Sequence, residues 1–327
     1  MWCQYFILLT SFIINHKVMG LVEQVVDRRA ALFRLPLTTS AIPLLWRGQP
    51  AIAQSMERNN LDFILSRFDD MQAPFQLNAL QYGVRGGLDT LLMPEWLLGK
   101  WTVRSRLAAS SAPLGRKYLP PDLRNMLITR DNENSDQEMV AKAKDAVAQA
   151  PGLEYQVQFI RRSSNDGAVV ADRAYNLKSV QDAAAGYSKV AQVTMKEAGR
   201  QLSVQYMPFD RNGNRIGPSR AEVYINARLE SSPRRDLDIF AFSEATRTIR
   251  LGERFASAAD AETLNVFRRT TALSGLEEKK ERIECRQRVL RFLTPNPNSE
   301  EGILWQDAKG RATAILDYDL ELTRQLS

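Results

Sequence analysis

The sequence predicts a mainly β protein in which antiparallel strands close into a barrel flanked by short helices. Apolar and polar residues alternate with period two in roughly eight to ten segments between residues 101 and 323. Residues that suit tight turns stand between several of these segments. The length of 327 residues, 44% of them hydrophobic, is ample for a buried core. Closing the sheet buries its apolar face and removes its exposed edges, whereas a two-sheet sandwich is the alternative.

Each predicted strand carries its apolar residues on one face. In the strand that begins at Trp101, polar side chains at Thr102, Arg104 and Arg106 alternate with apolar ones. The strand over 281–293 is long and charged, and we expect it to be bulged. The apolar faces of the first three strands comprise Trp101, Val103 and Leu107, then Leu153, Tyr155, Val157 and Phe159, then Leu202, Val204 and Tyr206. Further strands are predicted over 223–229, 239–249, 263–271, 281–293 and 312–323.

Turn and cap residues separate these elements. Asn176 is suited to cap a helix over Leu177–Ala185, and Gly186 is suited to end it. Residues that tolerate positive φ, as hairpin turns require, occur at Asn165-Asp166-Gly167, Asn212-Gly213 and Lys309-Gly310.

Two further helices are predicted outside the strand series. Gln54–Asp70 has helical spacing of its apolar residues, which are Leu61, Ile64, Leu65 and Phe68. The polar segment Asp122–Ala150 resembles a surface insertion, with a helix at about Gln137–Gln149. No internal repeat is evident.

The first 53 residues have the features of a targeting signal. Arg28-Arg29 precedes a moderately apolar stretch, Ala30–Trp46, and a small-x-small site follows at Ala51 and Ala53. A twin arginine, an apolar region and such a site are the parts of a translocation signal, with cleavage after Ala53. Pro residues within the stretch argue against a buried helix. The apolar run Trp2–Asn15 is too short to span a bilayer comfortably.

This signal divides the chain into three parts and alters its charge. We expect a plastid and thylakoid targeting presequence over 1–53, an N-terminal helical segment over 54–92 and the barrel domain over 93–327. Five of the 44 basic residues and two of the 38 acidic ones lie in 1–53, which leaves a net charge of +3 after cleavage. The paired basic residues are scattered along the chain, so we expect no nucleic-acid partner. The destination is the chloroplast thylakoid lumen, or alternatively a bacterial periplasm.

The scarcity of histidine and cysteine excludes several kinds of chemistry. His16 lies in the predicted presequence, so the mature chain would have no histidine for a copper, haem or zinc site, or for a Ser-His-Asp triad. Cys285 would be the one cysteine left after loss of Cys3, so no internal disulfide could form. It shares a face with Ile283 and Val289 and is expected to be a small core residue. We therefore predict no metal site, no cofactor and no catalytic residue.

Gly99-Lys100-Trp101 resembles the Gly-x-Trp start of the lipocalins and related barrels. It follows a short helical turn and opens an alternating strand. The resemblance implies that Trp101 plugs the closed end of a barrel and that Gly99 permits a tight approach of the backbone. The alternative is a core tryptophan of any β domain.

A wider resemblance covers roughly residues 93–324. The motifs that carry it are Pro94-Glu95-Trp96, Ala112–Gly115, Asp172–Asn176, Ser243-Glu244 with Arg247, and Gln287-Arg288-Val289 up to Pro295. They are similar to an uncharacterised domain family of cyanobacteria and chloroplasts. The resemblance implies a thylakoid-associated, lumenal, lipocalin-like protein, and it brings no activity and no catalytic residues. The long insertion at Asp122–Ala150 departs from the pattern.

Two charged motifs have both a functional and a structural interpretation. Arg173 could bind a ligand headgroup at a barrel mouth, but an Arg173–Asp172 or backbone contact, with Asn176 capping the helix, is favoured. Asp317, Asp319 and Glu321 share one strand face. Three carboxylates spread over about 13 Å cannot converge on one calcium ion, so a solvated face is favoured.

Three functions remain open. The protein could carry an apolar molecule such as a pigment or lipid inside the barrel, with wall residues Trp101, Val103, Tyr155, Phe159, Arg173 and Tyr206. It could act through its surface as an auxiliary factor of a thylakoid membrane complex in photosynthesis. A cofactor-free isomerase or cyclase acting on a hydrophobic substrate is the third. An enzyme would need an inward-facing carboxylate, and none of the positions assigned to the interior is acidic.

Overall fold

The computed structural model describes eleven stretches of the chain. These are residues 60–68, 91–119, 123, 152–163, 167–196, 199–215, 219–231, 238–252, 256–270, 281–294 and 300–325. The predicted signal with Ala51 and Ala53 and the predicted helix at 137–149 lie outside them.

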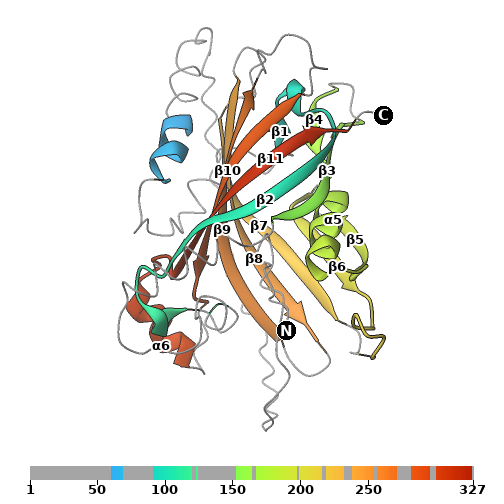
Figure 1. Cartoon of the computed structure of the whole chain (residues 1–327). Helices are drawn as coiled ribbons and strands as arrows, with labels where there is room; N and C mark the ends of the chain where they lie inside the picture. The colour runs from blue at the N-terminus through green and yellow to red at the C-terminus, as the bar shows by residue number, and fades with distance from the viewer. Residues whose placement is uncertain are drawn as a thin grey trace, which may run out of the picture.

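The described residues form one antiparallel sheet that curls into a half-barrel (Figure 1). The sheet order is β1-β4-β3-β2-β11-β10-β9-β8-β7-β6-β5. The strands are β1 (Leu92–Met93), β2 (Gly99–Ser111), β3 (Leu153–Arg161), β4 (Val169–Ala171), β5 (Val190–Lys196), β6 (Gln201–Tyr206), β7 (Arg220–Glu230), β8 (Ile239–Leu251), β9 (Ala256–Thr270), β10 (Arg282–Phe292) and β11 (Ala314–Arg324). The helices are η1 (Glu95–Leu97), η2 (Arg116–Tyr118), α5 (Arg173–Ala185) and α6 (Glu300–Ala308), with a further helix over residues 60–66.

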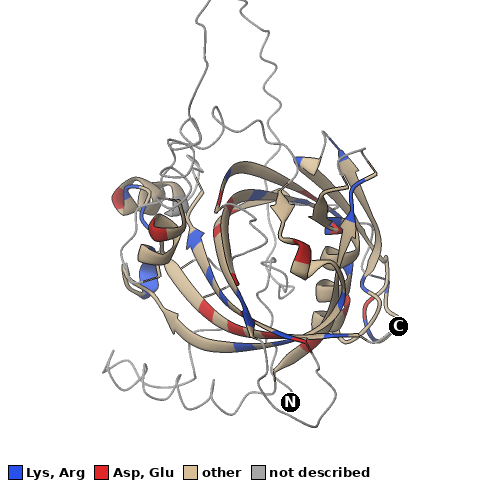
Figure 2. Ribbon diagram, turned by 90° about the horizontal axis from the view of Figure 1, so that it is seen from above, with Lys and Arg blue, Asp and Glu red and all other residues tan. Residues whose placement is uncertain are grey.

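The curl brings the two ends of the sheet toward each other, as the ring in Figure 2 shows. The last strand, β11, pairs with β2, so the chain's final strand lies beside its first long strand. The sheet ends at β5 on one side and at the short strands β4 and β1 on the other. Between β3 and β5 lies α5, which packs against both strands. The half-barrel is therefore completed by a helix rather than by a strand.

Side chains of α5 take over the hydrogen bonding of β3 where β4 ends. Asn176 Oδ1 accepts from the backbone N–H of Gln158 at 2.7 Å, and Asn176 Nδ2 donates to the Gln158 carbonyl at 3.1 Å. Two residues along the strand, the Gln156 N–H donates to Ser179 Oγ at 3.1 Å. These contacts satisfy backbone groups that the edge of the sheet would otherwise leave exposed.

The other side of α5 does the same for β5. Asp182 Oδ1 accepts from the backbone N–H groups of Lys189 and Val190, both at 2.8 Å. Lys178 donates to the Val190 carbonyl and also pairs with Asp182 at 2.9 Å. Because one helix bonds to both sheet edges, it fixes the distance between them.

Most predicted strands are confirmed, with some differences. The strand at 281–293 was expected to be bulged, and this is wrong, because β10 pairs with both neighbours without a register shift. Shifts occur instead between β11 and β2, β5 and β6, and β7 and β8. Short strands at 92–93 and 169–171 and the edge strand at 190–196 were not predicted. The sandwich alternative is wrong, since the described strands form one sheet.

The helix at 173–185 begins earlier than predicted. Asp172, and not Asn176, is its N-cap, because the Asp172 side chain accepts from the backbone N–H of Tyr175 at 3.0 Å. Asn176 is thereby free to bond to β3. The predicted end at Gly186 is confirmed, with φ at 72° in the left-handed region.

Apolar clusters occupy both faces of the sheet. The larger one fills the interior around Trp101, Phe240 and Ile283. A second one lies on the opposite face, where Ile64 and Phe68 of the N-terminal segment pack against strand residues including Leu264, Leu290 and Ile315. Here the predicted amphipathic pattern is confirmed except at Leu65, which is exposed. Within the described residues, no helix is long and apolar enough to cross a bilayer.

We expect Asp182→Ala to lower the free energy of unfolding by about 1.5–3 kcal/mol, because two backbone N–H groups lose a charged acceptor. Urea unfolding followed by circular dichroism measures this change. The control is Asp319→Ala, which removes an exposed pair with Arg106 and should cost less than about 0.5 kcal/mol. Equal effects of the two substitutions would show that α5 does not fasten the edge of β5.

Candidate ligand-binding cavity

One end of the barrel is closed around Trp101. The indole is fully buried, and its Nε1 donates to the Leu97 carbonyl at 2.8 Å. The guanidinium of Arg324, on the last strand, lies over the ring at 4.4 Å from the centroid. Gly99 has φ at 121°, and a Cβ there would come within 2.8 Å of Arg324 Nη1. Gly99 thus permits a close approach to Arg324, as predicted, whereas the likeness to a lipocalin start stays a prediction.

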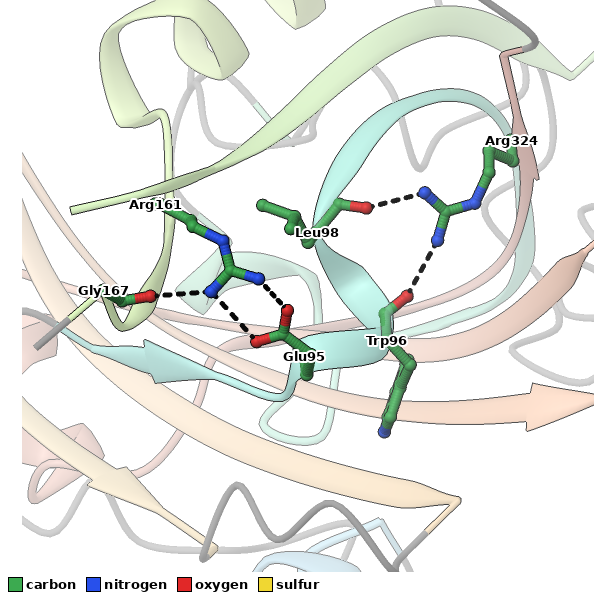
Figure 3. A network of polar contacts seen from close by, with 6 residues as sticks. All are labelled: Glu95, Trp96, Leu98, Arg161, Gly167 and Arg324. Carbon is green, nitrogen blue, oxygen red and sulfur yellow. Dashed lines mark hydrogen bonds and ion pairs between the residues drawn. The ribbon is translucent and has the colours of Figure 1, made fainter.

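The 3₁₀ helix η1 is anchored across this end from two directions (Figure 3). Arg324 donates to the carbonyls of Leu98 at 2.7 Å and Trp96 at 3.3 Å. From the other side, Arg161 at the end of β3 pairs with Glu95 and also donates to the Gly167 carbonyl at 3.0 Å. The helix therefore joins β3 to β11 at the closed end.

A cavity of about 200 Å³ lies inside the barrel and is partly open to solvent. This space is far larger than the roughly 10–15 Å³ that a cavity needs to hold a single water, so it has room for several waters or a small ligand. Its walls come from every strand except β5, from α5 and from the residue before β1. The lining is mostly apolar, and its apolar members are Leu91, Met93, Val103, Tyr155, Val157, Phe159, Ala171, Leu177, Val180, Leu202, Val223, Ile225, Phe242, Phe267, Leu320 and Leu322.

Four of the six predicted wall residues line this cavity. They are Val103, Tyr155, Phe159 and Arg173. Trp101 belongs instead to the closed end. Tyr206 lies in a separate cluster with Leu177 and Val190, beyond the lining.

Five of the seven polar lining side chains come from the neighbouring strands β8, β9 and β10, and the other two come from α5. The lining residues of β2, β3 and β11 are apolar apart from the Tyr155 hydroxyl. This arrangement suits a molecule that is mainly apolar and has polar character on one side. The polar members are Arg173, Asn176, Glu244, Thr246, Thr263, Asn265 and Gln287.

The charged residues of the lining are paired with each other. Arg173 donates to Glu244 through two bonds of 2.5 and 3.2 Å, and Arg228 Nε donates to the same carboxylate at 2.7 Å. Burial by itself would raise the pKa of Glu244, but the two guanidinium groups outweigh it and hold that pKa below its usual value. Glu244 is therefore a fixed carboxylate rather than a proton donor.

This cluster corrects two sequence interpretations. The favoured Arg173–Asp172 contact is wrong, since Arg173 pairs with Glu244, 71 residues further along the chain. The expectation that no inward position is acidic is also wrong, because Glu244 lines the cavity. The period-two pattern of β8 alone, which puts Phe242 and Glu244 on the same face, could have indicated it.

The carboxylates of β11 each pair with an arginine of a neighbouring strand. Asp319 and Glu321 lie on an exposed surface, as predicted, whereas Asp317 pairs with the buried Arg288. Cys285 is buried in the interior cluster, and burial raises the pKa of its thiol.

Sequence reasoning missed two buried amides, Asn265 and Gln287. They lie directly opposite each other on β9 and β10, and Gln287 Nε2 donates to Asn265 Oδ1 at 2.7 Å. Gln287 lies between Cys285 and Val289 on the same face of its strand. Its inward orientation therefore followed from the pattern that placed Cys285 in the core.

A second carboxylate, Glu230, lies near this charged cluster on β7. Burial raises the pKa of Glu230 to about 7, and neighbouring Glu244 adds to the effect, while Arg228 and a hydrogen bond with the backbone of Leu92 oppose it. Glu230 therefore changes charge close to neutral pH.

The raised pKa of Glu230 predicts a pH dependence of stability. In the unfolded chain a glutamate has a pKa of about 4.3, so the folded state binds the proton more tightly. The resulting contribution favours folding at low pH and is lost as the pH rises through about 7. We expect the wild type to lose stability relative to Glu230→Gln between pH 5 and pH 8. Urea unfolding of both proteins across this range measures the difference, and parallel pH profiles would contradict the prediction.

Comparison with known proteins gives one match. The family described as "Domain of unknown function (DUF6816)" matches residues 85–326, which include the closed end and all the residues that line the cavity. No curated protein and no solved structure matches the chain.

Proposed function

Because the chain belongs to the DUF6816 family, which as a domain of unknown function has no activity to transfer, we propose a function from the cavity itself. The protein binds a small, mainly apolar molecule inside the barrel and acts as a carrier. The observation that carries this proposal is the partly open, mostly apolar cavity of about 200 Å³.

Rigid surroundings support binding rather than collapse of this space. The closed end is fastened by Arg324 and Arg161, and the seam is fastened by α5. The sheet therefore cannot close further without breaking these bonds. Transfer of an apolar ligand from water into such a space is favourable by about 25 cal/mol per Å² of apolar surface removed from water.

The cargo we propose is a pigment or lipid of the thylakoid. Support for this comes from the predicted twin-arginine signal with its cleavage site at Ala51 and Ala53, and from the resemblance to thylakoid-associated proteins. The working compartment would then be the thylakoid lumen, with a bacterial periplasm as the alternative.

The test incubates the purified chain with a thylakoid pigment and lipid extract and then measures its mass by native mass spectrometry. We expect a retained mass that disappears in Val157→Trp, because the large ring fills the cavity. The matched control is Met195→Trp on β5, where the side chain is 51% exposed and does not belong to the lining. This control should retain the ligand.

A clean apo protein that sediments with a photosynthetic complex would contradict the carrier proposal. It would favour the auxiliary factor that acts through its surface. A retained mass that is equal in wild type and Val157→Trp would place the ligand outside the cavity.

A further inference from the structure

The polar wall of the cavity contains one buried acceptor without a partner. Gln287 is 7% exposed, and its Nε2 is used by Asn265. Its Oε1 is buried and has no hydrogen-bond partner among the described residues. Gln287 belongs to the cavity lining, so its side chain lies beside the space that a bound molecule would occupy.

An unpaired buried acceptor is unfavourable, because its hydrogen bonds with water are lost and nothing replaces them. Buried polar side chains in folded proteins are nearly all satisfied. A hydrogen-bond donor on the ligand would satisfy this one. The pairing with Asn265 holds the amide in a fixed orientation, which suits recognition.

The charges around the cavity favour a neutral ligand. The cluster beside the lining combines Arg173 and Arg228 with Glu244, and Glu230 lies close enough to affect them. Two cations and two carboxylates thus offset each other near and above neutral pH. An ionised ligand would find no uncompensated partner here and would lose its hydration.

We propose, building on the carrier function, that the ligand is a neutral apolar alcohol whose hydroxyl group bonds to Gln287 Oε1. A hydroxyl both donates and accepts, so it satisfies the Gln287–Asn265 pair whichever way the two amides are oriented. The rest of the molecule would contact the apolar walls, including Phe242 and Phe267, whose stacked rings lie 6.1 Å apart.

The test compares three ligands that share a ten-carbon chain, measured on the full-length protein. They are 1-decanol, decyl methyl ether and decanoate, each measured by displacement of the neutral fluorescent probe N-phenyl-1-naphthylamine. Decanol should bind roughly five- to tenfold more tightly than the ether, which lacks a donor. Equal affinities for decanol and the ether would overturn the proposal and leave the carrier function intact. Tighter binding of decanoate than of decanol would have the same two consequences.

Two variants test whether the preference for the alcohol over the ether depends on Gln287. Gln287→Met keeps the side-chain volume and should reduce decanol affinity to that of the ether, with ether binding unchanged. The control, Gln192→Met on the exposed side of β5, should keep the preference. If Gln287→Met fails to fold, the comparison of alcohol and ether binding to the wild type still tests the proposal. Failure of the probe itself to bind the wild type would overturn the carrier function, a result distinct from a lost alcohol preference.

Discussion

The structure depends on how the two edges of one curled sheet are joined. A strand would have to pair with both β3 and β5 to close the barrel, and instead α5 lies between them. Asn176 and Ser179 bond to backbone groups of β3, and Asp182 bonds to those of β5. Side chains replace the missing ladder, so the exposed edges that favour aggregation are covered while the sheet stays open.

This closure also creates the space inside. Leu177 and Val180 of α5 line the cavity from one side, and side chains of the sheet line the rest. Arg173 is the first residue of α5, and its side chain forms an ion pair with Glu244 of β8 across the interior. Because the charge pair is buried, removal of one partner would leave the other uncompensated, so the pair ties the helix to β8.

Much of the wall could be predicted from sequence. Period two placed Val103, Tyr155 and Phe159 inward, and each lines the cavity. The partner of Arg173 could not be predicted, since no local pattern specifies a contact 71 residues away. The amides of Asn265 and Gln287 interrupt apolar faces, and their significance appears only when two strands set them opposite each other.

The sequence alone determined most of the long strands, many of their inward residues and the role of Gly99 at the start of β2, because alternation and backbone freedom are local properties. Tertiary structure alone decided that a helix closes the sheet, which charges pair and which buried oxygen of the cavity lining lacks a partner. Those features depend on the register and curvature of the whole sheet, which arise from contacts between residues far apart in the chain. The shape and polarity of the cavity therefore depend on all the assembled strands and cannot be predicted from any single strand.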